Sequence, residues 1–536
     1  MTNKLLISIV AILIVAAAIV VFLAYTYLDI GLDPKSGGEL RIAMQSFSTE
    51  TLDPSSDNKD GLNYHGHMYD FLVGVDPEGR LDTRYGLLSG WQVSPTADSF
   101  TLTLREGAKW HDGESVDAED ARSSVEYYLR DEFTCGVCVT LKDAVSSLEV
   151  LDNENVLIRL NAPDVVFPGL LAAVEGDTPL LPSHVIDSAP GSLQASPIGT
   201  GPWRYAASTA GESVEFESNE DYWNTGRVSG FDTLTISLVP DESQRIALME
   251  SDKIDLAPIQ AESVGTVKGE GFSVDGPKHV LATTVRYFMS YDRDYLTSSL
   301  DFRKALQLSI DVEEITTSMF PSEAATIATG SALFTPVSPG YVEDLPAYPY
   351  DPDQARSLLA QSGYAGETIQ MLSLVAYGMS ELPPINEMIV EDWQAIGINV
   401  ELEATEWPAV QPLFQPRPQL FDDYAPAPVI HGAAPARPGG VINADSRNLG
   451  GGEGAMLTYF APNVGDGILK QLQATVNDED RALVLQALNR RTYGEYWAIP
   501  ILWRHDTYAI SPELIGWQPT NGTSSDLHFE TIRRAR

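Results

Sequence analysis

The segment LREGAKWHDGESVDAEDA, residues 104–121, places a histidine beside an aspartate, His111 and Asp112. These side chains can bind a metal ion or exchange a proton. The pair supplies at most two ligands, whereas a protein metal site takes about three or four. Asp-Gly is a strong turn signal, because aspartate bonds to nearby backbone groups and Gly113 accepts a positive φ. We therefore expect a turn between a strand and a helix.

A second histidine pair, His65 and His67, lies in NYHGHMYDFL. The following residues favour a helix, in which positions i and i+2 diverge by about 200°. The two imidazoles therefore cannot bind one ion from a regular helix, and there is no matching third ligand. One imidazole facing a ligand is the better interpretation, and His65 is the candidate.

The two cysteines, Cys135 and Cys138, have C-x-x-C spacing. A structural zinc site needs about four ligands, and no second pair completes one. A redox site of the thioredoxin kind would begin a helix after a strand, whereas the preceding YYLRDEFT is typical of a helix end. We expect a local disulfide, which outside the cytoplasm is the favoured state.

Strand and helix patterns alternate around these motifs. Strands are indicated at residues 39–43 and 99–105, the second by alternating apolar and polar side chains. A helix is predicted after Asp117, an N-cap followed three residues later by Asp120. A hairpin is indicated at residues 148–160. The sequence thus predicts an α/β chain with at least two sheets.

The chain has 536 residues, too many for a single core, so two or three domains are expected. Its formal net charge is −41, with a pI near 4.3. Such a surface repels phosphates and argues against nucleic-acid binding. The charge fits a solubilising exterior suited to a saline medium, and equally a preference for cationic ligands.

Residues 1–28 differ from the rest, because no charged residue occurs from Leu5 to Leu28. As a helix this stretch is long enough to span roughly 30 Å of hydrocarbon. A signal peptide has a shorter apolar region, about 7–15 residues, ending at a small-residue cleavage site. We expect an N-terminal transmembrane anchor, with a cleaved signal segment as the alternative, and a linker at residues 29–37.

Several segments together match the pattern of one family. They are GGELRIA (37–43), TLDP (51–54), YDFLVGVDPEGRL (69–81), the WHDG region (90–121), PIGTGPWRY (197–205), NEDYWN (219–224), PDESQRIALMESDKIDLAPI (240–259), FRKALQLSID (302–311), YPYDPDQARSLLAQSGY (348–364), IGINVELEATEW (396–407) and IPILWRHDTYAI (499–510). In this order and spacing they resemble the extracellular solute-binding proteins of family 5, the peptide- and nickel-type receptors of ABC importers. The resemblance covers nearly the whole chain after the apolar segment.

The resemblance implies an α/β fold of the type II periplasmic-binding-protein class, with two lobes joined by a hinge and an extra subdomain on lobe I. Carried onto this sequence, lobe I would comprise residues 38–62, 190–278 and 498–536. The extra subdomain would be 63–189 and lobe II 279–497. The WHDG motif would then be part of the scaffold.

The resemblance also implies a ligand cleft between the lobes. Peptide-binding members carry a Trp-x-x-Asp-Tyr-x-Asp-Pro-like stretch whose aspartate pairs with the peptide ammonium group. Here LFDDYAPAPVIHGAAPARPGG lacks the tryptophan and the Asp-Pro, which puts a standard peptide-ammonium site in doubt. Tyr287 and Ser290 would lie where the chain crosses between lobes. The candidate ligand-binding residues are Trp407, Tyr424, Asp422, Tyr287, Ser290, Tyr377, Trp503 and His65; core packing or a solvated loop is the alternative for each.

The function implied is that of a monomeric, extracytoplasmic receptor that captures a small solute, by default a short peptide, and delivers it to ABC permease subunits. No cofactor, metal or catalytic residue is expected. Two alternatives remain: a metal-dependent surface hydrolase that uses His111 and Asp112 or the His65–His67 pair, and a ligand sensor that uses the same clamp without transport.

Overall fold

Three main sheets, of seven, six and four strands, organise the chain. The computed structural model describes residues 37–57, 61–133, 135, 137–173, 176, 178–187, 191–195, 197–287, 296–332, 334–375, 379–406, 429–436, 468, 471–472 and 475–535. Within these ranges no helix combines the length and apolar composition needed to cross a bilayer. The expected anchor at residues 1–28 lies outside the described residues.

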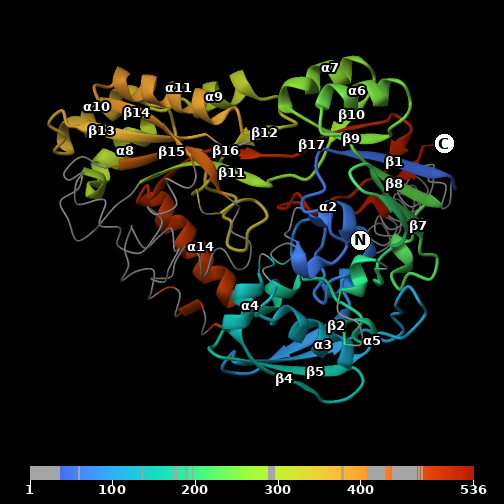
Figure 1. Cartoon of the computed structure of the whole chain (residues 1–536). Helices are drawn as coiled ribbons and strands as arrows, with labels where there is room; N and C mark the ends of the chain where they lie inside the picture. The colour runs from blue at the N-terminus through green and yellow to red at the C-terminus, as the bar shows by residue number, and fades with distance from the viewer. Residues whose placement is uncertain are drawn as a thin grey trace, which may run out of the picture.

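The seven-stranded sheet has the strand order β10-β17-β9-β1-β8-β7-β6. Its central strand β1 runs parallel to β8 and β9, whereas its outer pairs are antiparallel. The strands are β1 (Glu39–Met44), β6 (Trp203–Thr209), β7 (Ser213–Ser218), β8 (Thr233–Leu238), β9 (Leu256–Ile259), β10 (Ser273–Asp275) and β17 (Thr507–Ile510). Helices α6 (Glu242–Glu250) and α7 (Val264–Gly269) cover one face (Figure 1).

The six-stranded sheet has the order β12-β16-β11-β15-β13-β14. Its strands are β11 (Leu281–Tyr287), β12 (Ala325–Ile327), β13 (Thr368–Leu374), β14 (Asn399–Thr405), β15 (Val429–Ala436) and β16 (Ala498–Arg504). The helices of this part are α8 (Leu300–Leu308), α9 (Val312–Met319), α10 (Pro352–Gln361), α11 (Leu382–Ala395) and α14 (Asp478–Gly494). Figure 1 shows α9–α11 above the sheet and α14 below it.

The four-stranded antiparallel sheet has the order β2-β3-β5-β4. Its strands are β2 (Leu88–Val93), β3 (Ser99–Leu104), β4 (Val145–Val150) and β5 (Asn155–Leu160). The nearby helices are α3 (Ala118–Tyr128), α4 (Cys138–Ala144) and α5 (Ser183–Ile186). Along β3 the side chains of Phe100, Leu102 and Leu104 are buried in alternation with half-buried neighbours, as a strand with one core face requires.

The remaining elements are short. They are α2 (Leu62–His65), the β18–β19 pair (Leu514–Ile515 and Arg533–Arg534) and 3-10 turns at Pro54–Ser56, Gly66–Met68, Thr83–Tyr85, Phe167–Leu171, Ser192–Gln194, Thr225–Arg227, Ala261–Ser263, Leu296–Ser298 and Phe529–Thr531.

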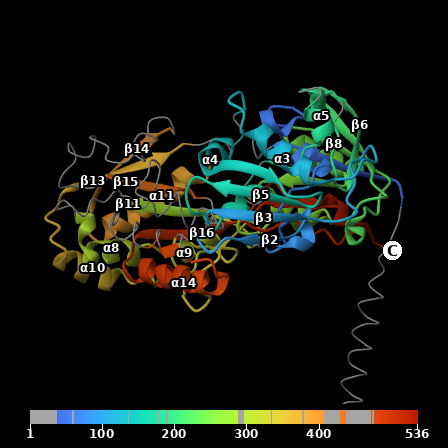
Figure 2. The same ribbon diagram turned by 90° about the horizontal axis from the view of Figure 1, so that it is seen from below.

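The apolar cores show which sheets belong together. One buried cluster joins side chains of the seven-stranded sheet, such as Ile42 and Ile236, to those of the four-stranded sheet, such as Leu102 and Ile158. A separate cluster fills the six-stranded sheet and its helices. Figures 1 and 2 agree that the six-stranded and seven-stranded sheets lie at opposite ends of the molecule. The mixed α/β class expected from the sequence is confirmed.

Candidate functional site

The chain passes between the two large sheets in two described segments. The first crossing, residues 276–280, links β10 to β11, and the second crossing, residues 505–506, links β16 to β17. The change of sheet thus comes after β16, later than residue 498, where it was expected from the sequence. Tyr287, expected at a crossing, instead ends β11 at the opposite end from the first crossing, paired with Ile430.

The two crossings run side by side and bond to each other. The backbone N–H of Val280 donates to the carbonyl oxygen of Arg504 at 3.0 Å, and that of Asp506 donates to Pro277 at 3.0 Å. At Gly276 an added Cβ would lie 2.3 Å from the carbonyl oxygen of Asp506. The two strands of chain therefore approach closely, and glycine permits this approach.

Two histidines meet at the crossings. The backbone N–H of His279 donates to Nδ1 of His505 at 3.0 Å, and the ring centroids lie 5.0 Å apart. Burial, together with repulsion from the His505 imidazole and from the charge of Lys278, lowers the pKa of His279 to about 4. Burial and Lys278 likewise lower the pKa of His505 to about 4. Both rings are therefore neutral at pH 7 and add no positive charge there.

The C-terminal segment braces the first crossing. The backbone N–H of Lys278 donates to Oδ1 of Asn521 at 2.8 Å, and the backbone N–H of Gly522 donates to the carbonyl oxygen of Lys278 at 2.8 Å. Gly522 has a φ of +81°, which favours glycine. These two hydrogen bonds hold the middle of the first crossing against the C-terminal segment.

Trp503, one of the candidates, lies near the end of β16, two residues before the second crossing begins. It is 2% exposed and packs with Ala282 and Ala328, apart from the larger core of the six-stranded sheet. Its indole Nε1 is buried and has no hydrogen-bond partner among the described residues. Leaving a buried donor of this kind unpaired is costly.

The other candidates are not brought together with Trp503 by any described contact. Trp407, Tyr424, Asp422, Ser290 and Tyr377 lie outside the described residues. His65 is described: it is 1% exposed, and its Nε2 lies 3.5 Å from Oδ2 of Asp57. His67 is also buried, and its Nε2 lies 3.0 Å from the carbonyl of Asn63. Both imidazoles are thus buried inside the protein. The helix expected to continue through these histidines is shorter than predicted, because α2 ends at His65 and a 3-10 turn follows at Gly66–Met68.

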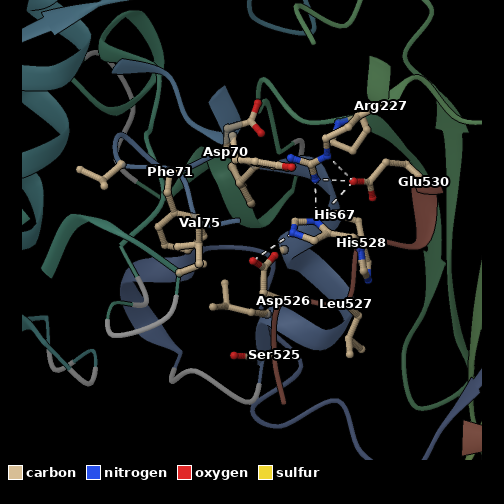
Figure 3. Close-up of a pocket in the computed structure, with 18 residues that line it drawn as sticks. His67, Asp70, Phe71, Val75, Arg227, Ser525, Asp526, Leu527, His528 and Glu530 are labelled. Carbon is tan, nitrogen blue, oxygen red and sulfur yellow. Dashed lines mark hydrogen bonds and ion pairs between the residues drawn. The ribbon is translucent and has the colours of Figure 1, made fainter. Parts of the chain in front are cut away.

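A small cavity of about 50 Å³ lies beside His67 (Figure 3). Arg227 reaches across it and donates from Nε to Oε1 of Glu530 at 2.8 Å, while Nε2 of His528 lies 3.1 Å from Oδ2 of Asp526. Burial alone would raise the pKa of the Glu530 carboxyl, but the charge of Arg227 outweighs this effect and holds that pKa well below its usual range. The cavity holds a water or two, not a solute. We interpret these ion pairs as contacts that hold the C-terminal segment, residues 526–530, against the rest of the protein.

The WHDG motif forms the expected turn. Gly113 has a φ of +96°, and Oδ1 of Asp112 accepts from the backbone N–H of Glu114 at 3.1 Å. Nε2 of His111 lies 3.0 Å from the carbonyl of Gly201, and burial lowers the pKa of this histidine to about 4. Oδ2 of Asp112 meets Nε2 of His184 at 2.8 Å. The described side chains include no group of three potential metal ligands.

The disulfide expected from the sequence is confirmed. Cys135 and Cys138 are bonded, with Cα atoms 5.1 Å apart, and both are buried. The bond closes a tight loop at the start of α4.

His279, His505 and the Arg227–Glu530 pair were not predicted from the sequence. Only His505 had a nearby signal, because it follows a strongly apolar strand and precedes another. Arg227 and Glu530 are far apart in the sequence and share no motif, so only the folded chain shows their contact.

The comparisons with known proteins agree on one family. The family model of bacterial extracellular solute-binding proteins, family 5 (middle region), matches residues 83–424, which is more than half of the chain. The chain belongs to this family.

Curated proteins similar to this family 5 chain carry different ligand names. The heme-binding protein A of Haemophilus influenzae is 25% identical over 65% of this chain and 67% of its own length. The oligopeptide-binding protein AppA of Bacillus subtilis is 23% identical over 73% of each chain. The dipeptide-binding protein of Escherichia coli is 23% identical over 60% of this chain, and the match spans just under two thirds of that relative, 63%.

Solved structures show the same fold over almost the full length. HbpA2 from Haemophilus parasuis superposes with a TM-score of 0.76 at 19% identity, covering 93% of this chain and all of that one. The binding protein DppA of Helicobacter pylori, solved with the peptide STSA, gives a TM-score of 0.65 at 19% identity, covering 94% and 99%. The fold is therefore that of periplasmic binding proteins.

Proposed function

We propose that this family 5 protein is the extracytoplasmic substrate-binding component of an ABC importer. It captures a small solute between two lobes and delivers it to permease subunits. Lobe I corresponds to the seven-stranded and four-stranded sheets and lobe II to the six-stranded sheet. The N-terminal apolar segment holds the receptor, as a monomer, at the outer face of the membrane.

The observation that carries this proposal is the pair of adjacent crossings. Two separate cores joined by two hydrogen-bonded segments can rotate about those segments while the packing inside each core stays intact. A ligand that contacts both lobes only when they are closed shifts the population toward the closed form. Binding then produces a shape that permease subunits can recognise, without any bond being made or broken.

The names of the relatives, which include dipeptide, oligopeptide and heme, support a proposal for the solute class. We propose a short peptide or peptide-like compound. Trp503 supplies an indole donor beside the second crossing, and this position supports its role as a cleft residue. Trp407, Tyr424, Asp422, Tyr287, Ser290 and Tyr377 remain predicted contacts.

The first test identifies the solute. Mass spectrometry of small molecules that copurify with the full-length chain, followed by calorimetric titration, should give one saturable site and no product. X-ray scattering should show a smaller radius of gyration with the solute bound. An unchanged scattering profile at saturation, or chemical conversion of the solute, would contradict the proposal.

The second test concerns Trp503. Replacing it with phenylalanine keeps an aromatic ring and removes the N–H donor, so solute affinity should fall about tenfold. Trp91→Phe, on β2 of the four-stranded sheet, is the matched control and should bind as the wild type does. If Trp503→Phe binds the solute as tightly as the wild type does, Trp503 is not a ligand contact. The scattering experiment would then remain as the test of lobe closure.

A further inference from the structure

A second, shallower hollow of about 350 Å³ opens where the seven-stranded and four-stranded sheets meet. It is lined by Thr83, Arg84, Ser89, Arg105, Trp223, Asn224 and Thr225. None of these residues belongs to the six-stranded sheet or to either crossing, so the hollow is distinct from the proposed solute site. Its size is at the lower end of the range for small-molecule sites, about 300–1,000 Å³.

The centre of this hollow is the guanidinium group of Arg105. It donates from Nη2 to the carbonyl of Thr83 at 2.5 Å and from Nε to that of Gly86 at 3.4 Å. Its carbon Cζ lies 4.6 Å from the ring centroid of Trp223, and Nε1 of that tryptophan donates to Asp70 at 2.7 Å. The guanidinium is therefore fixed in position before any ligand arrives.

Arg105 differs from its neighbours in having no carboxylate partner within the described part of the chain. Arg84 pairs with Asp82 at 2.9 Å, and Arg227 pairs with Glu530. Acidic residues outnumber basic ones by 75 to 34, so an arginine in a hollow without an acidic partner is unusual here. Its two hydrogen bonds to backbone carbonyls use two of its five N–H groups, and the remaining three suit a planar oxyanion.

The polar groups around Arg105 indicate what else the ligand carries. The hydroxyl of Ser89 donates its proton to the carbonyl of Thr103 at 3.2 Å, so toward a ligand in the hollow its oxygen can act only as an acceptor. The Asn224 amide donates from Nδ2 to the carbonyl of Arg84 at 3.1 Å, which leaves Oδ1 to accept. Two acceptors lie beside Arg105, the arginine of the hollow that has no carboxylate partner among the described residues, and this set matches a ligand with a carboxylate and hydroxyl groups.

We propose that this hollow binds a small hydroxylated carboxylate, whose carboxylate pairs with Arg105 and whose hydroxyl groups donate to Ser89 and Asn224. The ligand makes no contact with the crossings. It therefore binds independently of the transported solute.

Calorimetric titration of the full-length chain with glycerate, acetate and inorganic phosphate tests this proposal. Glycerate should bind saturably, and more tightly than acetate, because acetate lacks the hydroxyl donors. Phosphate should bind more weakly than glycerate. No saturable glycerate binding up to about 50 mM would overturn the proposal, and equal affinity for phosphate would overturn the assignment of a carboxylate.

Thr225 offers a blocking variant with a matched control. It is exposed at the first position of a 3-10 turn, where an acidic residue is well tolerated. Thr225→Glu places a carboxylate beside Arg105 without removing its hydrogen bonds, so glycerate affinity should fall tenfold or more, whereas Thr225→Gln should retain it. Glycerate binding that persists in Thr225→Glu would show that the anion binds elsewhere and would overturn the proposal.

Arg105→Lys provides an independent variant. It keeps the charge and loses the planar pair of donors, so glycerate binding should weaken while the melting temperature stays close to that of the wild type. Wild-type glycerate affinity in this variant would overturn the role of the guanidinium. Solute-induced compaction should be unchanged in all three variants, so a failure of this proposal is distinguishable from a failure of the proposed transport function.

Discussion

Buried neutral histidines are the residue-scale feature that links structure to pH. His67, His111, His279 and His505 each have a pKa lowered to about 4, with burial as the largest cause. In the unfolded chain a histidine titrates near pH 6.5. As pH falls from about 6.5 to about 4, the unfolded state therefore binds protons that the folded state does not, and stability decreases.

His505 allows this to be measured at one site. Its surroundings include Lys278, Arg504 and Asp275, and the imidazole is 6% exposed. In His505→Gln the loss of unfolding free energy between pH 7 and pH 4.5 should be smaller than in the wild type by about 2 kcal/mol. Urea unfolding at the two pH values gives this difference. Thr326→Val is the control, since Oγ1 lies 3.4 Å from Nε2 of His505 and has no proton to titrate in this range; it should keep the wild-type pH dependence.

Residue-scale predictions from the sequence succeeded where the chemistry was local. The turn at Asp112–Gly113 and the disulfide depend on neighbours a few residues away, and both are confirmed. The environment of Arg105 depends on Trp223, more than a hundred residues later, so no local pattern indicates it.

At the scale of elements, the close approach of the two crossings is the decisive feature. Gly276→Ala places a methyl group 2.3 Å from a backbone carbonyl, which must move. We expect a loss of about 1–3 kcal/mol in unfolding free energy, with weakened solute binding. Gly265→Ala on α7 is the matched control, since nothing lies within 4 Å of its added Cβ; it should be neutral or stabilising. Chemical denaturation measures the unfolding free energy of both variants, and titration measures their solute affinity. Wild-type stability in Gly276→Ala would contradict the expectation and show that the crossings separate easily.

Elements with strong local signals were predicted well. The helix after Asp117 begins with the expected cap, in which Asp117 and Asp120 bond reciprocally to the backbone. The expected strand at residues 99–105 and hairpin at 148–160 are present as β3 and as β4 with β5. The sheet to which β16 belongs was not predictable in this way, because its apolar sequence suits either core and only its pairing with β11 settles the choice.

For the whole molecule, the net charge of −41 destabilises the folded state, because the like charges on its surface repel one another. Salt screens this repulsion, with a Debye length of about 10 Å at 0.1 M. The melting temperature should therefore rise as sodium chloride increases from about 0.05 M to about 1 M. Calorimetry in the same salt series at pH 4.5, near the pI of about 4.3, is the control and should show a smaller rise. A fall with salt at pH 7 would mean that attractive ion pairs dominate.

The order of motifs along the chain was enough to indicate the family, because that order reflects the full path of the backbone. The resemblance placed residues 63–189 on lobe I, but it did not give the buried side chains that the two sheets share, such as Ile42 and Leu102, because these come from segments far apart in the sequence.

The described chain begins on the seven-stranded sheet and ends in the short β18–β19 pair beside it. Glu39 opens β1, and Nη2 of Arg534 donates to the carbonyl of Glu39 at 3.4 Å. A tether joined at residue 37 and a tag fused to the C-terminus would thus both attach to the part of the molecule that holds the seven-stranded sheet, the proposed lobe I. With the clamp proposed above, attachment to a sensor surface through either end would leave the six-stranded sheet and its helices as the part that is free to move.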